Sequence, residues 1–114
     1  MNDYAEASAA GRVTGDFANW CKRPEPGAHA ISAGKIGPDE SETVRNNPKM
    51  RRERLLPVPP EVDPDRTAYM WAHVRLGGGA GMSAPRMHYL DDVKNTGKIY
   101  IGYLGSRLTI KSTN

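Results

Sequence analysis

The chain has 114 residues, which suits one domain (residues 1–114) with one modest core, because single domains commonly span ~50 to 200 residues. Its 12 glycines and 9 prolines predict many loops, and the net charge of +3 permits an anionic partner without the charge density of a dedicated nucleic-acid tail. No apolar run reaches the ~20 residues that cross a bilayer, and Met1 to Glu6 does not resemble a signal peptide, so we expect a cytoplasmic protein without membrane contact.

Two short helices are predicted near the start of the chain. Residues 2–10 are rich in alanine and favour a helix that ends at Gly11, a good C-terminal cap. A second helix would place Phe17, Trp20 and Cys21 on one stripe facing the core. Because Cys21 is the single cysteine, it cannot form an internal disulfide or a cysteine-based metal cluster, and we expect it to pack in the core.

The next part of the chain mixes a loop, a helix and a basic segment. Residues 24–37 lack apolar periodicity and are predicted to form a loop. Pro38, followed by two carboxylates, is typical of a helix start, and this helix should finish before Pro48. Residues 45–54 hold five cations against Glu53 alone, a net charge of +4, which attracts phosphate unless acidic neighbours compensate it.

The second half of the chain carries the strand signals. Prolines confine any strand in residues 55–60 to a sheet edge. Three later runs, residues 68–76, 86–91 and 98–104, read as strands. A glycine-rich linker and a compact polar turn join them, which predicts an antiparallel meander. The linker, residues 77–84, lacks the Lys-Ser/Thr pair of a phosphate-binding loop and is predicted to be a hairpin loop.

Period-2 alternation assigns the two faces of this sheet. The predicted core face consists of Met70, Ala72, Val74, Leu76, Met87, Tyr89, Ile99, Ile101 and Tyr103. The predicted outer face consists of Tyr69, Trp71, His73, Arg75, Arg86, His88, Tyr100 and Gly102. If Leu76 pairs with Pro85 across the hairpin, then His73 lies opposite His88 and Arg75 lies opposite Arg86.

The outer face mixes aromatic rings with cations, the composition with which proteins stack bases and contact phosphates of single strands. The alternative is a face covered by the N-terminal helices, with Trp71 in the core and the arginines at the rim. The candidate nucleic-acid-binding residues are Arg51, Arg52, Arg54, Trp71, His73, Arg75, Arg86 and His88.

His73, His88 and Asp92 include the ligand types of a metal-dependent nuclease or hydrolase. No recognised metal-ligand spacing accompanies them, so we expect the two histidines to be structural or recognition residues, with no metal and no cofactor. Asp92 more often serves a turn. Covalent catalysis has no visible nucleophile motif, and we therefore expect a protein that is not an enzyme.

The stretch Tyr69 to Leu90, followed by Thr96-Gly97-Lys98-Ile99-Tyr100-Ile101-Gly102-Tyr103-Leu104-Gly105 and Ser112-Thr113-Asn114, resembles the terminal segment of larger, uncharacterised bacterial proteins. The resemblance covers roughly the second half of the chain. It names no family and implies no activity, and it suggests a bacterial module that works with a partner.

These observations predict an α+β fold: short N-terminal helices (within residues 1–54, with loops) packed on a three- or four-stranded antiparallel sheet (within residues 55–114). The predicted function is a non-catalytic binding module that contacts nucleic acid, weakly and with low specificity, or a larger bacterial protein assembly. The alternatives are the metal-dependent nuclease or hydrolase and a structural oligomeric subunit that buries the apolar edge Leu55 to Val58 against another copy.

Overall fold

The computed structural model describes residues 1–13, 15–24, 26–28, 30–76 and 85–110, so the predicted hairpin loop at 77–84 lies outside the described residues. The strands of the main sheet, in spatial order, are β1 (Ile36–Gly37), β4 (Ala72–Arg75), β5 (Arg86–Asp92) and β6 (Lys98–Gly105), and a small sheet pairs β2 (Leu55–Pro57) with β3 (Thr67–Tyr69). The helices are α1 (Asn2–Ala9), α2 (Phe17–Lys22), α3 (Glu42–Asn46), α4 (Pro48–Glu53) and α5 (Val93–Thr96), with a 3-10 turn η1 (Ala33–Lys35). The predicted α+β class with an antiparallel sheet is confirmed.

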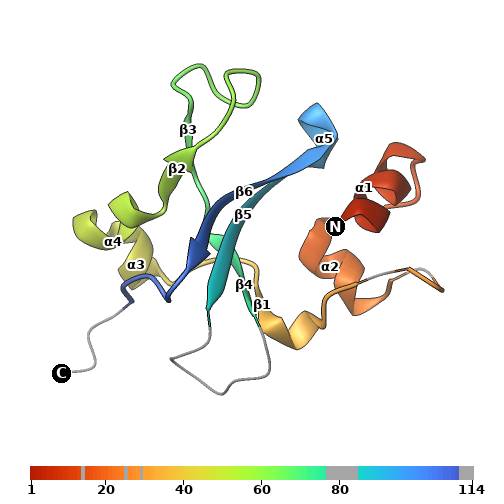
Figure 1. Ribbon diagram of the computed structural model, residues 1–114, viewed down its shortest axis with the longest axis horizontal. Coiled ribbons are helices and arrows are strands. Elements are labelled where there is room, and N and C mark those ends of the chain that lie inside the picture. The colour runs from red at the N-terminus through yellow and green to blue at the C-terminus, as the bar shows by residue number, and fades with distance from the viewer. Residues whose placement is uncertain (14, 25, 29, 77–84, 111–114) are drawn as a thin grey trace.

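The two N-terminal helices pack on one face of the main sheet, as predicted. Asp16 begins α2, because its side chain accepts a hydrogen bond of 2.9 Å from the Asn19 amide. The core then joins side chains of both helices to the sheet; its buried members are Tyr4, Phe17, Trp20, Cys21, Val74, Tyr89 and Val93. Figure 1 shows α1 and α2 on one side of the main sheet and α3 and α4 on the other.

The pairing of β4 with β5 confirms the predicted register. His73 lies opposite His88 and Arg75 lies opposite Arg86. The Leu76 amide also donates a hydrogen bond of 2.9 Å to the Pro85 carbonyl, which continues this pairing beyond the strands. The face that holds the two histidines is therefore opposite to the face under α1 and α2.

A fourth strand, β1, joins the main sheet from the segment predicted to be a loop. Ile36 pairs with Val74, and Gly37 pairs with His73. Two residues are too few for period-2 alternation to indicate a strand, so only the long-range pairing with β4 reveals it.

The predicted strand at 68–76 is in fact two strands in two sheets. β3 pairs with β2, and β4 pairs with β5, so the chain changes sheets at Met70 and Trp71. The Met70 amide donates a hydrogen bond of 2.8 Å to the Arg54 carbonyl. Met70 is fully buried, but its side chain lies against Leu56 and Gly102 and not in the predicted common core with Val74.

A β-bulge in β6 overturns part of the predicted face assignment. Tyr89 pairs with Ile101 and His88 pairs with Tyr103, so Gly102 is the extra residue and the alternation reverses there. Tyr103 consequently shares a face with His88 and does not belong to the core face. Ile101 is on the predicted face but is 54% exposed, because it lies in an edge strand beyond the reach of the N-terminal helices.

The helices of the middle segment differ from the prediction in their starts. The helix expected at Pro38 begins four residues later, as α3, where the Ser41 hydroxyl accepts a hydrogen bond from the Val44 amide. It ends before Pro48, as predicted, and Pro48 opens α4.

The polar turn predicted at residues 92–97 contains α5, which ends at Gly97 in the left-handed conformation. Among the described residues, no helix is long and apolar enough to span a membrane.

Candidate functional site

The second face of the main sheet, opposite α1 and α2, carries the polar side chains that could bind a ligand. At its centre the rings of His73 and His88 stack, with centroids 5.1 Å apart and planes inclined by 28°. His88 is 2% exposed, and the side chain of His73 is 23% exposed. Burial, above all, lowers the pKa of His88, because a charged imidazole loses its hydration there.

The break between β3 and β4 fixes both imidazole rings. The carbonyls of Met70 and Trp71 lie in this break, and they accept hydrogen bonds of 2.9 Å from Nδ1 of His88 and of His73, respectively. A carbonyl is only an acceptor, so each Nδ1 carries a proton, and Nε2 is the ring nitrogen that could offer a lone pair. The bend that divides the predicted strand is therefore what orients the two histidines.

A buried ion pair closes this face from the α3–α4 side. Arg54 is 1% exposed, and its guanidinium binds Glu40 and donates hydrogen bonds of 2.8 Å to the Met50 and Thr109 carbonyls. The neighbouring Glu53 carboxylate accepts two hydrogen bonds of 3.0 Å from Thr109, one from its amide and one from its hydroxyl. The C-terminal part of the described chain is thus held over the sheet, and Arg54 serves structure and is not available to a partner.

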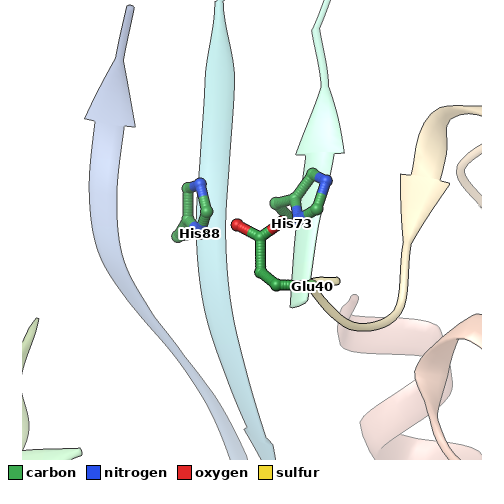
Figure 2. Close-up of side chains that lie close together, drawn as sticks. All are labelled: Glu40, His73 and His88. Atoms are coloured by element: carbon green, nitrogen blue, oxygen red, sulfur yellow. Dashed lines mark ion pairs between the residues drawn. The ribbon is translucent and has the colours of Figure 1, made fainter. Parts of the chain in front are cut away.

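Glu40, His73 and His88 form a group with ligand atoms within 4.8 Å of one another (Figure 2). This donor set would suit a transition metal, since zinc sites combine histidine nitrogens with a carboxylate. The orientation of the two imidazole rings opposes the binding of a metal ion. Stacked rings direct their in-plane lone pairs side by side, and Nε2 of His73 lies against Gly37, where an added Cβ would be 2.5 Å from it. A common ion would require at least one imidazole to turn.

Asp92, the acidic residue expected beside the histidines, lies elsewhere. Its carboxylate accepts hydrogen bonds of 2.9 Å from the Thr96 hydroxyl and 3.2 Å from the Asn95 amide, at the start of α5. Glu40 takes the position near the histidines. The sequence offered no signal for this, because Glu40 follows Pro38 in a segment that reads as a helix start.

A second group of side chains stands at the edge of this face; we call it the aromatic–arginine stack and define it as Arg45, Arg51, Tyr69 and Trp71. The rings of Tyr69 and Trp71 are stacked, with centroids 4.7 Å apart and planes within 7°. The Arg45 guanidinium lies over Trp71 and that of Arg51 over Tyr69, each 5.1 Å from the ring centroid. Both arginines are exposed and both rings are half-buried. Arg45 also pairs with Asp39 at 3.2 Å.

A third group, the arginine cluster, lies at the opposite end of β4 and β5 and consists of Arg75, Arg86 and Arg107. Arg86 is 9% exposed, and burial, followed by the charges of Arg107 and Arg75, lowers its pKa. The Nε of Arg75 is buried, and within the described part of the chain it has no hydrogen-bond partner. A cavity of about 120 Å³ beside the cluster is lined by Glu40, Arg54, His73, Arg86, His88, Arg107, Leu108 and Ile110.

The predicted binding residues therefore divide among different environments. Arg51 and Arg52 are exposed on α4, and Trp71 is half-buried beside Arg45. Arg54 and His88 are buried, so neither presents its polar end to a large partner. Arg45 and Tyr69 were not in the predicted binding set, although period-2 alternation had put Tyr69 on the same face as Trp71; the contact with Arg45 depends on the fold of α3.

No family model, curated protein or solved structure matches the chain. The resemblance of its second half to terminal segments of larger bacterial proteins therefore stays a prediction. What the chain does must be argued from its own side chains.

Proposed function

We propose that the protein is a non-catalytic module that binds single-stranded nucleic acid through the aromatic–arginine stack. The observation that carries this proposal is the parallel pair of Tyr69 and Trp71 with one exposed arginine over each ring. Aromatic faces accept any base, and nearby guanidinium groups contact phosphates, so this combination favours binding with low sequence preference.

The exposed arginines allow the stack to open toward a ligand. Arg45 and Arg51 rest on the ring faces through long side chains that can swing toward phosphates, and a base can then occupy the face that a guanidinium leaves. Arg52, exposed in the last turn of α4, adds a further cation close to Arg51. Of the five cations in residues 45–54, Arg54 is buried and paired with Glu40, and the other four are exposed, which supports attraction of a phosphate backbone.

Fluorescence anisotropy with a labelled single-stranded oligonucleotide, measured over a range of salt concentrations, tests the proposal. If three or four phosphates are neutralised, log affinity should fall with log salt at a slope of ~2 to 3. Arg51→Gln and Arg52→Gln should each reduce that slope by ~1 or less. Arg23→Gln is the matched control, because Arg23 is an exposed arginine that follows α2, on the other side of the sheet (Figure 1).

Trp71→Ala separates stacking from charge. The loss of the ring should weaken binding by ~1 to 3 kcal/mol while leaving the salt slope unchanged. Circular dichroism of the variant checks that the fold is retained. If the wild-type chain shows no salt-dependent association with single strands at low ionic strength, the proposal is wrong and the partner must be sought among proteins.

A protein partner is the second candidate, and a separate observation favours it. β6 is an edge strand of eight residues in the main sheet, and two of its large apolar side chains, Ile101 and Leu104, are 54% and 67% exposed. Long edge strands with exposed apolar residues pair with strands of other chains.

We infer that β6 is a better contact for a second copy than Leu55 to Val58, because Leu55–Pro57 is already paired with β3 and Val58 is buried. Light scattering should then report a dimer that Ile101→Lys converts to a monomer.

A further inference from the structure

We propose that the arginine cluster and the adjoining cavity form a binding site for one phosphate group, either free inorganic phosphate or a phosphate at the end of a larger ligand. This site lies at the other end of β4 from the aromatic–arginine stack and does not depend on the function proposed for the stack.

The first argument is the charge. Arg75 and Arg86 are directly opposite each other in the β4–β5 register, and like charges in such a pair repel. Arg107 is close enough to lower the pKa of Arg86 as well. Within the described part of the chain, neither Arg75 nor Arg107 forms an ion pair with a carboxylate. β4 and β5 therefore hold two guanidinium groups side by side, with that of Arg107 close by, and the charges of Arg75 and Arg107 favour an anion at this place.

The second argument is the unused donor. The Nε–H of Arg75 is buried without a hydrogen-bond acceptor among the described residues, an arrangement that costs free energy unless a ligand or water supplies an acceptor. A phosphate group supplies several acceptor oxygens, and the planar fork of arginine fits two of them at once. The donor and the charge thus favour the same class of ligand.

The third argument is the shape of the cavity. Its volume of about 120 Å³ is several times the ~10 to 15 Å³ that one water needs on the same measure, so it leaves room for an ion of the size of phosphate. Arg86 and Arg107 line it together with the apolar side chains of Leu108 and Ile110. Arg75 does not line the cavity but lies beside it, directly opposite Arg86 in the strand register. The carboxylate that also lines it, Glu40, is already paired with Arg54, which weakens its repulsion of an anion.

The site is tested by adding inorganic phosphate to the full chain. Isothermal titration calorimetry measures the binding, and thermal unfolding measures the change in unfolding temperature. Phosphate should bind saturably and raise the unfolding temperature, whereas chloride at equal ionic strength should not. Arg107→Gln and Arg75→Gln should each weaken phosphate binding at least tenfold. Arg23→Gln is the matched control, because Arg23 is an exposed arginine at the end of α2 and belongs to neither proposed site, so this variant should bind phosphate as the wild type does.

The same variants give a readout that does not require ligand. Because the arginines repel one another, Arg75→Gln and Arg107→Gln should unfold at the same temperature as the wild type or higher in phosphate-free buffer, so a loss of binding cannot be ascribed to unfolding. The proposal is overturned if wild-type binding of phosphate does not saturate, or if both variants bind phosphate as tightly as the wild type.

A second arm distinguishes the sources of the phosphate. A single-stranded oligonucleotide with a 5′-phosphate should bind at least tenfold more tightly than its unphosphorylated form if the site takes a terminal phosphate, and Arg107→Gln should remove that difference. Equal affinity of the two oligonucleotides, with inorganic phosphate still bound, identifies free phosphate as the ligand. Loss of oligonucleotide binding in Trp71→Ala with phosphate binding intact would separate this site from the aromatic–arginine stack.

Discussion

The hydroxyl of Tyr4 donates a hydrogen bond of 2.7 Å to the carboxylate of Asp91, which lies 87 positions later in the chain. The same carboxylate oxygen accepts a hydrogen bond of 2.8 Å from the Phe17 amide, and the other oxygen accepts one of 3.2 Å from the Val93 amide. One side chain on β5 therefore fastens α1, the first turn of α2 and the start of α5 to the main sheet.

Tyr4→Phe should remove the first of these bonds with little change in shape. Hydrogen bonds to charged groups contribute about 1.5 to 3 kcal/mol, so the free energy of unfolding should fall by about that amount in urea denaturation. Tyr100→Phe is the matched control: its hydroxyl donates to the neutral Thr96 hydroxyl at 3.0 Å, and its loss should cost ~1 kcal/mol or less. Equal losses in the two variants would contradict the role of Asp91.

Val74 and Ile101 lie on the same face of the main sheet, but the central strand and the edge strand predict different costs for truncating them. Val74 is 1% exposed in the core, so Val74→Ala should destabilise the protein by ~1 to 3 kcal/mol. Ile101 is 54% exposed on the edge strand, so Ile101→Ala should cost less than ~0.5 kcal/mol although it removes more atoms. Chemical denaturation of both variants measures the contrast, and a larger loss at Ile101 would place it in the core.

Buried His88 should make stability depend on pH. Burial lowers its pKa in the folded state below the ordinary value of 6.5, and the charges of His73 and Arg54 oppose its protonation further, while the Met70 carbonyl and Glu40 favour it. The unfolded chain then binds a proton more readily, so the free energy of unfolding should fall as the pH drops through 6.5 and level off below the folded pKa.

His88→Gln is the control for this titration. The variant lacks the titrating ring but keeps a side-chain donor for the Met70 carbonyl, so the difference between its pH profile and that of the wild type isolates His88. The slope of that difference should not exceed ~1.4 kcal/mol per pH unit, the value for one proton. Parallel profiles across pH 5 to 7 would show that His88 takes up its proton equally well in the folded chain.

Metal content is the measurement that separates a binding module from a metal-dependent hydrolase. Protein purified without chelator should contain less than one equivalent of zinc or other transition metal, because the imidazoles of His73 and His88 are stacked and Nε2 of His73 lies against Gly37. Elemental analysis measures the equivalents of metal per chain. A stoichiometric ion that is lost in both His73→Ala and Glu40→Gln would instead establish Glu40, His73 and His88 as ligands.

The sequence predicted the register of β4 and β5 because that register depends on local alternation and on one hairpin. The same reasoning failed at Tyr103, since the bulge at Gly102 reverses the alternation. Gly102 is glycine for a reason outside its own strand: an added Cβ would lie 2.6 Å from Sδ of Met70 and 2.8 Å from Cβ of Leu56. Such a contact between two sheets cannot be inferred from a period-2 pattern.

The polar groups on the second face show the same division between local and long-range information. Alternation placed His73 and His88 together, and the structure stacks them. Glu40 and Arg107 reach that face only because the segments before α3 and after β6 fold over the sheet, and neither segment has a periodic signal. On this face, His73 and His88 on regular strands were therefore predictable as neighbours, whereas Glu40 and Arg107 on irregular segments were not.

Met70 occupies the point where the two sheets meet, and this has a consequence for cooperativity. Its amide donates to the Arg54 carbonyl, its carbonyl accepts from His88, and its side chain is fully buried against Gly102. The first contact belongs to the small sheet and the other two to the main sheet, so the two sheets cannot separate without breaking the contacts of Met70 on one side or the other. We therefore expect the two sheets to open as one unit, although they share no strand. In hydrogen–deuterium exchange, the Met70 amide should then exchange as slowly as the most protected amides of β5.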